Sequence, residues 1–377
     1  MTGAGPLLVL DGRGVARESP AADVVWVYRR GRRRWLDEWR TGQASGEFFY
    51  GLLSLRHRYR VGFVEADRVS ALRLLWHPVD RLIARRMGMG FALDLALANL
   101  PTLNRARVVI STVDASGLPL AVLKRAGLLG ASVIYISQGL SDRIAGYGPD
   151  RWLARQYRRA LLGVERLAVF SAGAAAALAA WLEIPSERVQ VVPFGTDCEF
   201  WRSTTPGDAG GPDIVSVGSD PGRDYATLLN AAGDLRLHVV TTQPLPLDGR
   251  PTVRRTTSHT PRELRDIYCR ARFVVIPLHD RSQPSGQSAA LQAMSCGKAV
   301  ILTRTRGFWG EPHLRDGENC VLVPPADPEA LAGAIRRLWS DPAACVAIGH
   351  AARETVARHF TEPRMAEALA ALIESHR

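Results

Sequence analysis

Short apolar runs rich in valine and isoleucine alternate with helical stretches along the chain. In the first half, six such runs predict strands at residues 22–28, 59–66, 107–114, 132–139, 166–171 and 189–195. Short runs of this kind, separated by helical stretches, are the pattern of parallel β-α-β units whose strands are buried on both faces. The first half therefore predicts a parallel sheet with crossover helices.

A second series of runs repeats this pattern. It predicts strands at residues 213–219, 235–242, 252–258, 271–278, 299–304 and 319–325, and three final helices near 327–340, 342–359 and 362–376. The stretch between the two series, residues 203–213, is rich in Gly, Pro and Thr and is typical of a linker. We predict an α/β protein with two doubly wound, Rossmann-like domains, residues 1–200 and 201–361, and ligands at the carboxyl ends of their strands.

Composition points to an ordinary globular protein, with 46% hydrophobic and 23% charged residues. The five cysteines are scattered, form no CxxC pair and have no metal-ligand spacing, which favours a reduced compartment such as the cytoplasm. The N-terminus lacks the basic start of a signal peptide. The uncharged stretch 167–182 is interrupted by Ser171 and Gly173, so a strand followed by a helix explains it better than a membrane span.

Positive charge is concentrated in the first half. Residues 1–200 hold 27 Arg and Lys against 18 Asp and Glu, a net charge of +9, whereas residues 201–377 hold 21 against 19, a net charge of +2. The excess is either a solvated basic face or a surface for an anionic partner, such as a lipid headgroup at the inner membrane face or a phosphorylated acceptor. The basic run 29–34 has tryptophans beside it but no nucleic-acid-binding motif, so no nucleic-acid partner is expected.

The strongest chemical signal is the segment 284–300, PSGQSAALQAMSCGKAV. It predicts a loop containing Gly286, a helix with Ser288 in its first turn, a stop at Gly297 and then a buried strand. A helix N-terminus preceded by small residues presents free N–H groups and partial positive charge, which suits a phosphate. Gln292, one turn further, would reach the attached sugar. The alternative is an ordinary loop–helix–strand unit.

Polar residues also follow other predicted strands. Gly218 and Ser219 end the first strand of the second series, and Arg223 follows within one turn. A guanidinium there can hold a diphosphate bidentately, although an ion pair with Asp220 or Asp224 is the alternative.

In the first half, three more positions are candidates. The triplet Ser45-Gly46-Glu47 predicts a helix start whose amides could meet a phosphate, or a plain helix cap. Asp114 and Gln138 each end a predicted strand, where ligands bind, and a cap of the following helix is the alternative for each.

Several segments together resemble glycosyltransferase family 4. They are VVPFGTDCEFW (191–201), VGSDPGRDYATLLNAA (217–232), SGQSAALQAMSCGKAVILT (285–303) and LRDGENCVLVPPADPEALAGAI (314–335), in the order found in that family. The resemblance implies a GT-B fold and transfer of a sugar from a nucleotide donor with retention of anomeric configuration and without metal. It also implies that the second domain binds the donor, the first binds the acceptor, and the last helix, about 362–377, packs back on the first domain.

The resemblance also implies roles for individual residues. Arg223 matches the basic residue that holds the donor diphosphate, Gln292 matches a glutamate that holds the ribose, and Gly46 matches a loop glycine near the donor phosphate. We therefore expect a catalytic set of Arg223, Gln138 and Asp114. The expected donor-binding set is Gly46, Gly218, Ser219, Arg223, Ser285, Gly286, Gln287, Ser288 and Gln292.

Departures from the family pattern keep alternatives open. Ser219 replaces a second arginine, Pro284 replaces the glutamate that contacts the donor sugar, Gln292 is an amide and Gln138 replaces a histidine. Asp280, His279 and Gln283 are candidates for the missing glutamate. The expected reaction is transfer from a nucleotide sugar, UDP favoured, to a sugar, lipid-linked or small-molecule acceptor in polysaccharide or glycoconjugate biosynthesis. A catalytically silent nucleotide-sugar-binding protein and a nucleotide-sugar epimerase are the alternatives.

Overall fold

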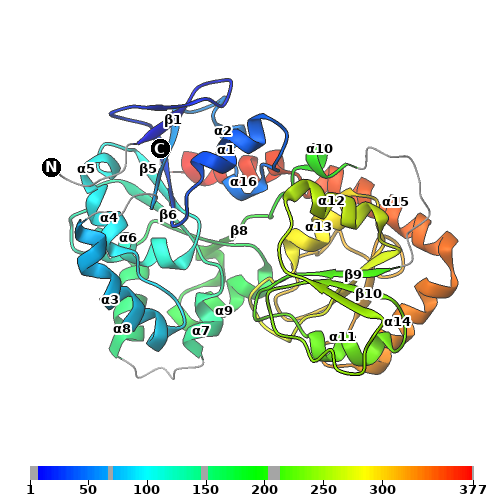
Figure 1. The fold of residues 1–377 in the computed structure, drawn as a ribbon. Helices are drawn as coiled ribbons and strands as arrows, with labels where there is room; N and C mark the ends of the chain where they lie inside the picture. The colour runs from blue at the N-terminus through cyan, green and yellow to red at the C-terminus, as the bar shows by residue number, and fades with distance from the viewer. Residues whose placement is uncertain (1–6, 67–70, 146–151, 203–212, 376–377) are drawn as a thin grey trace. The chain divides into compact units, whose positions relative to one another are not determined.

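The structure is a computed structural model that describes residues 7–66, 71–145, 152–202 and 213–375. The chain forms two compact units (Figure 1). The first unit contains Met1–Arg40, Phe48–Pro193 and Met365–Arg377, and the second contains Thr41–Glu47 and Phe194–Arg364. The short segment 41–47 therefore belongs with the second unit although the first unit surrounds it in sequence.

The first unit is built on a sheet of eight strands in the order β2-β1-β4-β3-β5-β6-β7-β8. The strands are β1 (Leu8–Leu10), β2 (Ala16–Glu18), β3 (Val24–Tyr28), β4 (Val61–Glu65), β5 (Val108–Ser111), β6 (Ser132–Ile136), β7 (Arg166–Val169) and β8 (Val189–Val191). Pairing is parallel from β4 to β8, whereas β1 is antiparallel to both β2 and β4. Every residue of β3, β4 and β5 is buried, as expected for strands covered on both faces.

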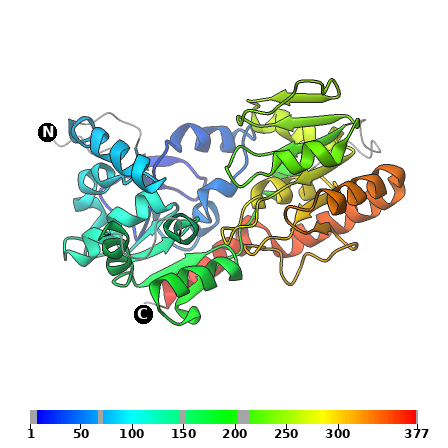
Figure 2. The same cartoon turned by 90° about the horizontal axis from the view of Figure 1, so that it is seen from below.

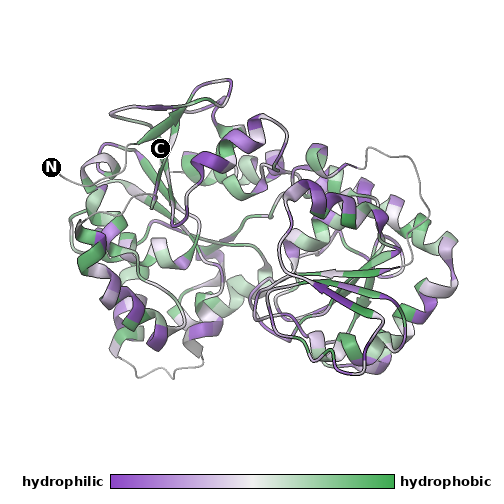
Figure 3. Cartoon of the chain, in the orientation of Figure 1, coloured by the Kyte–Doolittle hydropathy of each residue, from purple (hydrophilic) through white to green (hydrophobic). Residues whose placement is uncertain are grey.

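Helices of the first unit cover this sheet. They are α1 (Arg33–Arg40), α2 (Leu52–Leu55), α3 (Ala71–Met87), α4 (Leu93–Ala98), α5 (Leu100–Leu103), α6 (Asp114–Arg125), α7 (Leu140–Ala145), α8 (Trp152–Leu161), α9 (Ala172–Leu182) and most of α16 (Glu362–Glu374). Apolar side chains of α4, α6, α8 and α9 form one core with those of the central strands. Figure 3 shows the hydrophobic colouring of these strands and the mixed colouring of the helices that cover them.

The second unit contains a fully parallel sheet of six strands in the order β11-β10-β9-β12-β13-β14. The strands are β9 (Ile214–Val217), β10 (Leu237–Val240), β11 (Val253–Thr256), β12 (Phe273–Ile276), β13 (Val300–Thr303) and β14 (Val321–Val323). The helices are α10 (Cys198–Trp201), α11 (Tyr225–Ala232), α12 (Pro261–Arg270), α13 (Gln287–Ser295), α14 (Pro328–Ser340) and α15 (Pro342–His359). Helices α14 and α15 lie side by side (Figure 2).

Side-chain caps fix where most helices of the second unit begin. Asp224, Asp327 and Asp341 each accept a hydrogen bond from an N–H group in the first turn of α11, α14 and α15, respectively. Thr260 and Glu263 form a reciprocal capping box at the start of α12. Such caps satisfy N–H groups that have no partner inside a helix. The start of α13 differs, because no side chain caps it.

The predicted α/β class is confirmed, and each of the twelve predicted strands is present in a shorter form. The predicted final helices coincide with α14, α15 and α16 within two residues. Strands β1 and β2 were not predicted. The helix predicted to begin at residues 45–47 is present as a short 3-10 helix, Glu47–Phe49, and not as an α-helix. Residues 203–212 of the predicted linker lie outside the described residues. In the described ranges, no helix has the length and apolar character to cross a membrane.

Candidate functional site

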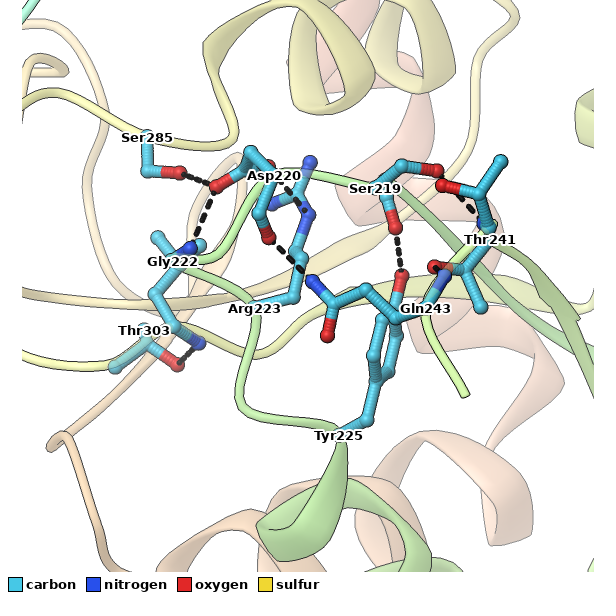
Figure 4. A network of polar contacts seen from close by, with 12 residues as sticks. Ser219, Asp220, Gly222, Arg223, Tyr225, Thr241, Gln243, Ser285 and Thr303 are labelled. Atoms are coloured by element: carbon cyan, nitrogen blue, oxygen red, sulfur yellow. Dashed lines mark hydrogen bonds and ion pairs between the residues drawn. The ribbon is translucent and has the colours of Figure 1, made fainter. Parts of the chain in front are cut away.

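Arg223 lies in the loop that connects β9 to α11. The loop leaves the sheet at Gly218, and Asp224 caps the helix that follows. Backbone pairing of Arg223 with Leu278 holds the loop against the segment after β12. The Arg223 side chain is only 4% exposed, so its guanidinium is buried at the carboxyl edge of the sheet (Figure 4). The alternative, an ion pair on the surface, is therefore wrong about the position of Arg223, which is buried. It is right about the partner, because Asp220 contacts the guanidinium.

The buried guanidinium is incompletely satisfied. Nε of Arg223 lies 3.2 Å from Oδ2 of Asp220, an ion pair without the geometry of a hydrogen bond. Nε and Nη1 have no hydrogen-bond acceptor among the described residues. Burying a charged donor without an acceptor is costly, and buried polar groups are nearly always paired. An anion bound here would supply the missing acceptors.

Helix α13 begins beside this guanidinium. Its N-cap, Gly286, has φ 76°, and no side chain caps the helix or adds negative charge to its first turn. A Cβ atom placed on Gly286 would lie 2.9 Å from Nη1 of Arg223. The guanidinium therefore lies close to the first turn of α13. Both groups attract anions, the first as a full charge and the second as a helix N-terminus.

Hydrogen bonds within the loop fix its shape. Oδ1 of Asp220 accepts bonds from the Gly222 N–H group (3.0 Å) and from the Ser285 hydroxyl (2.6 Å). The Ser219 hydroxyl accepts a bond from the backbone of Thr242 at 2.9 Å. These contacts tie the β9–α11 loop to the start of α13 (Figure 4). Internal hydrogen bonds therefore hold this candidate anion site in place, which is the arrangement that makes fixed donors effective.

Gln292 and Gly46 make contacts that differ from those expected. Nε2 of Gln292 donates to Oε1 of Glu47 at 3.0 Å, and its Oε1 accepts from the Tyr268 hydroxyl at 3.5 Å. The Gly46 N–H group donates to Asp197 at 2.9 Å. Both groups are therefore engaged inside the second unit, so a ribose contact by Gln292 or a phosphate contact by Gly46 requires an exchange of partners.

Glu47 is the buried acid at the centre of these contacts. It is fully buried, and its Oε1 accepts bonds from Gln292 and from the indole N–H of Trp201, each at 3.0 Å. Burial raises the pKa of Glu47 above its usual range, and nearby Asp197 adds to the effect. Glu47 was part of the triplet 45–47, but no pattern in the sequence indicated that α13 would supply its partner.

Glu47→Gln should make stability less dependent on pH. A carboxyl with a raised folded-state pKa binds its proton more tightly when folded, so its contribution to stability falls as pH rises from the usual pKa of Glu through the raised value. Glutamine keeps an Oε1 acceptor for Trp201 and Gln292 but cannot ionise. Compared with the parent protein at the same pH, the Glu47→Gln variant should therefore be more stable at about pH 8 than at about pH 5. Denaturant unfolding at both pH values measures this difference.

Glu47→Ala is the matched control. It removes the acceptor that Trp201 and Gln292 share, and each buried donor left without a partner costs about 1–3 kcal/mol. The alanine variant should therefore be destabilised at both pH values. A change in stability on Glu47→Gln that is the same at both pH values would show that ionisation of Glu47 has no influence on stability.

Asp114 and Gln138 lie together in the first unit. Asp114 is buried at the first residue of α6 and accepts bonds from the Tyr135 hydroxyl (2.7 Å) and from the Gln138 N–H group (3.1 Å). Burial raises the pKa of Asp114 despite these bonds. The Gln138 side chain donates to the Thr112 carbonyl and to the Tyr50 hydroxyl. Asp114 therefore positions the loop that carries Gln138, and this pair belongs to a different unit from Arg223.

Two of the three candidates for the missing glutamate, Asp280 and His279, already have polar contacts. Asp280 accepts bonds from both the backbone and the side chain of Arg306. His279 lies 3.6 Å from Asp224, the cap of α11. The contacts of Asp280 and His279 do not select either of them as a sugar ligand.

Residues 223–341 match the family of group 1 glycosyl transferases. These residues include Arg223 and α13, the two parts of the candidate anion site, together with β12 and α14. This match covers residues 223–341 only, and over this region the resemblance to glycosyltransferase family 4 is confirmed. The match identifies the protein as a glycosyltransferase. No match to the sequence was found among the curated proteins.

Solved structures show the same fold over nearly the whole chain. HepE of Anabaena, solved in complex with UDP-glucose, matches with a TM-score of 0.66 and 13% identity, covering 93% of this chain and 99% of that one. Sucrose-phosphate synthase of Thermosynechococcus elongatus matches with a TM-score of 0.63 and 16% identity, covering 94% and 98%. A glycosyltransferase of Rickettsia africae has a TM-score of 0.62 and 13% identity, covering 93% and 97%. The GT-B fold is therefore confirmed.

Proposed function

We propose that this glycosyltransferase moves a sugar from a nucleoside-diphosphate donor, UDP favoured, to an acceptor with retention of anomeric configuration. The observation that carries the proposal is the buried Arg223 guanidinium, whose Nε and Nη1 lack acceptors among the described residues beside the uncapped start of α13. A diphosphate provides the charge and the number of acceptors that this site needs. The HepE complex with UDP-glucose supports UDP as the nucleotide.

Charge stabilisation explains how such a site promotes transfer. As the bond between the sugar and the diphosphate breaks, negative charge builds on the leaving phosphate oxygens. Arg223 and the first amides of α13 are fixed donors for that charge, and each such donor is worth about 3–4 kcal/mol of transition-state stabilisation. The acceptor hydroxyl attacks the same face of the sugar, and the departing phosphate takes the hydroxyl proton. No protein base is needed in this mechanism.

The other proposed residues have supporting roles. Gly218, Ser219, Ser285 and Gly286 shape the loops beside the diphosphate. Gln292 is proposed to hold the ribose once its amide is released from Glu47, and Gly46 to approach the phosphate once its N–H group is released from Asp197. We assign donor binding to the second unit and acceptor binding to the first, where Gln138 and Asp114 are the residues proposed to take part in transfer.

A screen of nucleotide sugars tests the proposal. The intact protein is heated with UDP, GDP, TDP and ADP sugars, and the donor should stabilise it by about 2.7 kcal/mol at a concentration about 100 times its Kd. Incubation with the stabilising donor and a panel of sugar, lipid-linked and small-molecule acceptors should release the free nucleotide. Proton NMR of the product should show the donor's anomeric configuration, with equal rates in EDTA. Stabilisation by none of these nucleotides would contradict the proposal, and loss of activity in EDTA would contradict metal independence.

A silent binding protein is the second candidate function. Pro284 stands where the family contacts the donor sugar, and the Gln292 amide is held by Glu47 and Tyr268. These features favour a chain that keeps the diphosphate site but not the sugar site. Stabilisation by free UDP as large as that by UDP sugars, together with neither transfer nor hydrolysis, would support this candidate.

A further inference from the structure

Helix α3 of the first unit has two different apolar faces. Its inner face contains Trp76 and Ile83, which pack against the core. Trp76 also donates a hydrogen bond from its indole N–H to the Phe91 carbonyl at 2.8 Å, and Asp80 pairs with Arg29 at 3.0 Å. These contacts identify the side of the helix that faces the core, and the exposed fractions of the other apolar residues show which of them face solvent.

The outward face contains a continuous apolar stripe. Leu72, Leu75, Val79 and Leu82 are spaced three, four and three residues apart, which places them in one row along a helix. Their exposed fractions are 36%, 77%, 39% and 56%. Leu74, beside this row, is 65% exposed. Of the eleven large hydrophobic residues exposed in the described chain, these five lie on one helix, whereas scattered single residues are the ordinary case.

Positive charge borders the stripe. Arg81, Arg85 and Arg86 are exposed on the same helix. The only acidic residue of α3 is Asp80, and it is turned inward to Arg29 and to the backbone of Phe91. The outward face therefore combines apolar side chains with arginines and has no carboxylate of its own.

We propose that this face of α3, formed by Leu72, Leu75, Val79 and Leu82 with Arg81, Arg85 and Arg86, lies on an anionic lipid bilayer. A helix with an apolar stripe and a basic border binds in the plane of the interface, with its apolar side chains among the acyl chains and its cations at the headgroups. A negatively charged surface complements this border. The inference goes beyond sugar transfer and does not depend on it.

Vesicle flotation with the intact protein tests this surface. We expect binding to phosphatidylcholine vesicles that contain phosphatidylglycerol, weaker binding to phosphatidylcholine alone, and weaker binding at high salt, which screens the headgroup charge. Leu75→Ser combined with Leu82→Ser should lower the partition coefficient at least tenfold. Replacing Arg81, Arg85 and Arg86 with glutamine should lower it about a hundredfold, because each arginine near the surface contributes about fivefold.

Matched controls use the second unit. Val346 is 59% exposed on α15, so Val346→Ser removes a comparable apolar side chain. Replacing Arg336, Arg337 and Arg353 with glutamine removes the same charge from α14 and α15. The controls should bind vesicles as the parent protein does, with unchanged melting temperatures in both sets. Equal loss of vesicle binding in the controls would overturn the proposal. Serine variants that bind vesicles normally would also overturn it, as would serine variants that change a dimer into a monomer without a change in vesicle binding.

Discussion

Arg223→Ala should lower the affinity for UDP and the rate of transfer by at least about a hundredfold while the protein stays folded. Among the described residues, the guanidinium is the only buried group of this site that carries a full positive charge, and its Nε and Nη1 have no hydrogen-bond acceptor there. The same lack of acceptors means that the folded protein gains little from burying it. Its removal should therefore cost binding and catalysis far more than it costs stability.

Calorimetric titration with UDP, steady-state rates with the donor found by screening, and the melting temperature separate these effects. Arg250→Ala is the matched control, because Arg250 donates to the Leu229 carbonyl (2.6 Å) and to Asn230 (3.2 Å). These partners lie toward the end of α11, whereas Arg223 precedes its start. The control should lose stability but keep UDP affinity. UDP affinity that is unchanged in Arg223→Ala, or equally reduced in both variants, would remove Arg223 from the donor site.

Most of the sheet architecture could be predicted because it depends on local patterns. Central strands such as β5 and β12 are buried throughout, so they appear in the sequence as continuous apolar runs. Strands β1 and β2 have three residues each and pair antiparallel at the sheet edge. Their sequence resembles a loop, and their pairing with β4 depends on contacts far along the chain. The sequence therefore predicts the centre of each sheet better than its edge.

The candidate site shows the same limit. The loop of Arg223 and the start of α13 follow from strand ends, glycines and spacing, all of which are local features. The bond between Gln292 and Glu47 joins residues 245 positions apart. No spacing rule relates residues at that distance, so Gln292 was predicted as a ribose ligand and Glu47 was not predicted at all. Long-range polar pairing is the feature that a single sequence does not contain.

Helix α3 presents a related case. Its apolar residues were visible in the sequence, but two apolar rows on one helix cannot be assigned to core and surface by periodicity. The hydrogen bond from Trp76 and the ion pair of Asp80 identify the inner row. Once the inner row is identified, the other row is assigned to the exposed surface.

Gly286→Ala should remove UDP binding and also destabilise the second unit. Gly286 has φ 76°, a left-handed conformation that costs a residue with a side chain about 1–2 kcal/mol. Its Cβ would lie 2.6 Å from a methyl carbon of Ile276 and 2.9 Å from Nη1 of Arg223. Overpacking of this kind costs about another 1–3 kcal/mol. Relief of the overlap must displace either the guanidinium or the start of α13, and both are proposed phosphate ligands.

Gly317→Ala is the control that separates the cost of steric overlap from the cost of the left-handed backbone conformation. Gly317 has φ 75°, and a Cβ there would meet nothing within 4 Å. Denaturant unfolding should therefore show only the conformational cost in Gly317→Ala, and titration with UDP should give the parent affinity. The difference between the two variants measures the close approach of α13 to Arg223. Equal stability and equal UDP affinity in both would mean that the donor site tolerates a side chain at position 286, and that the approach of these two groups has no part in binding.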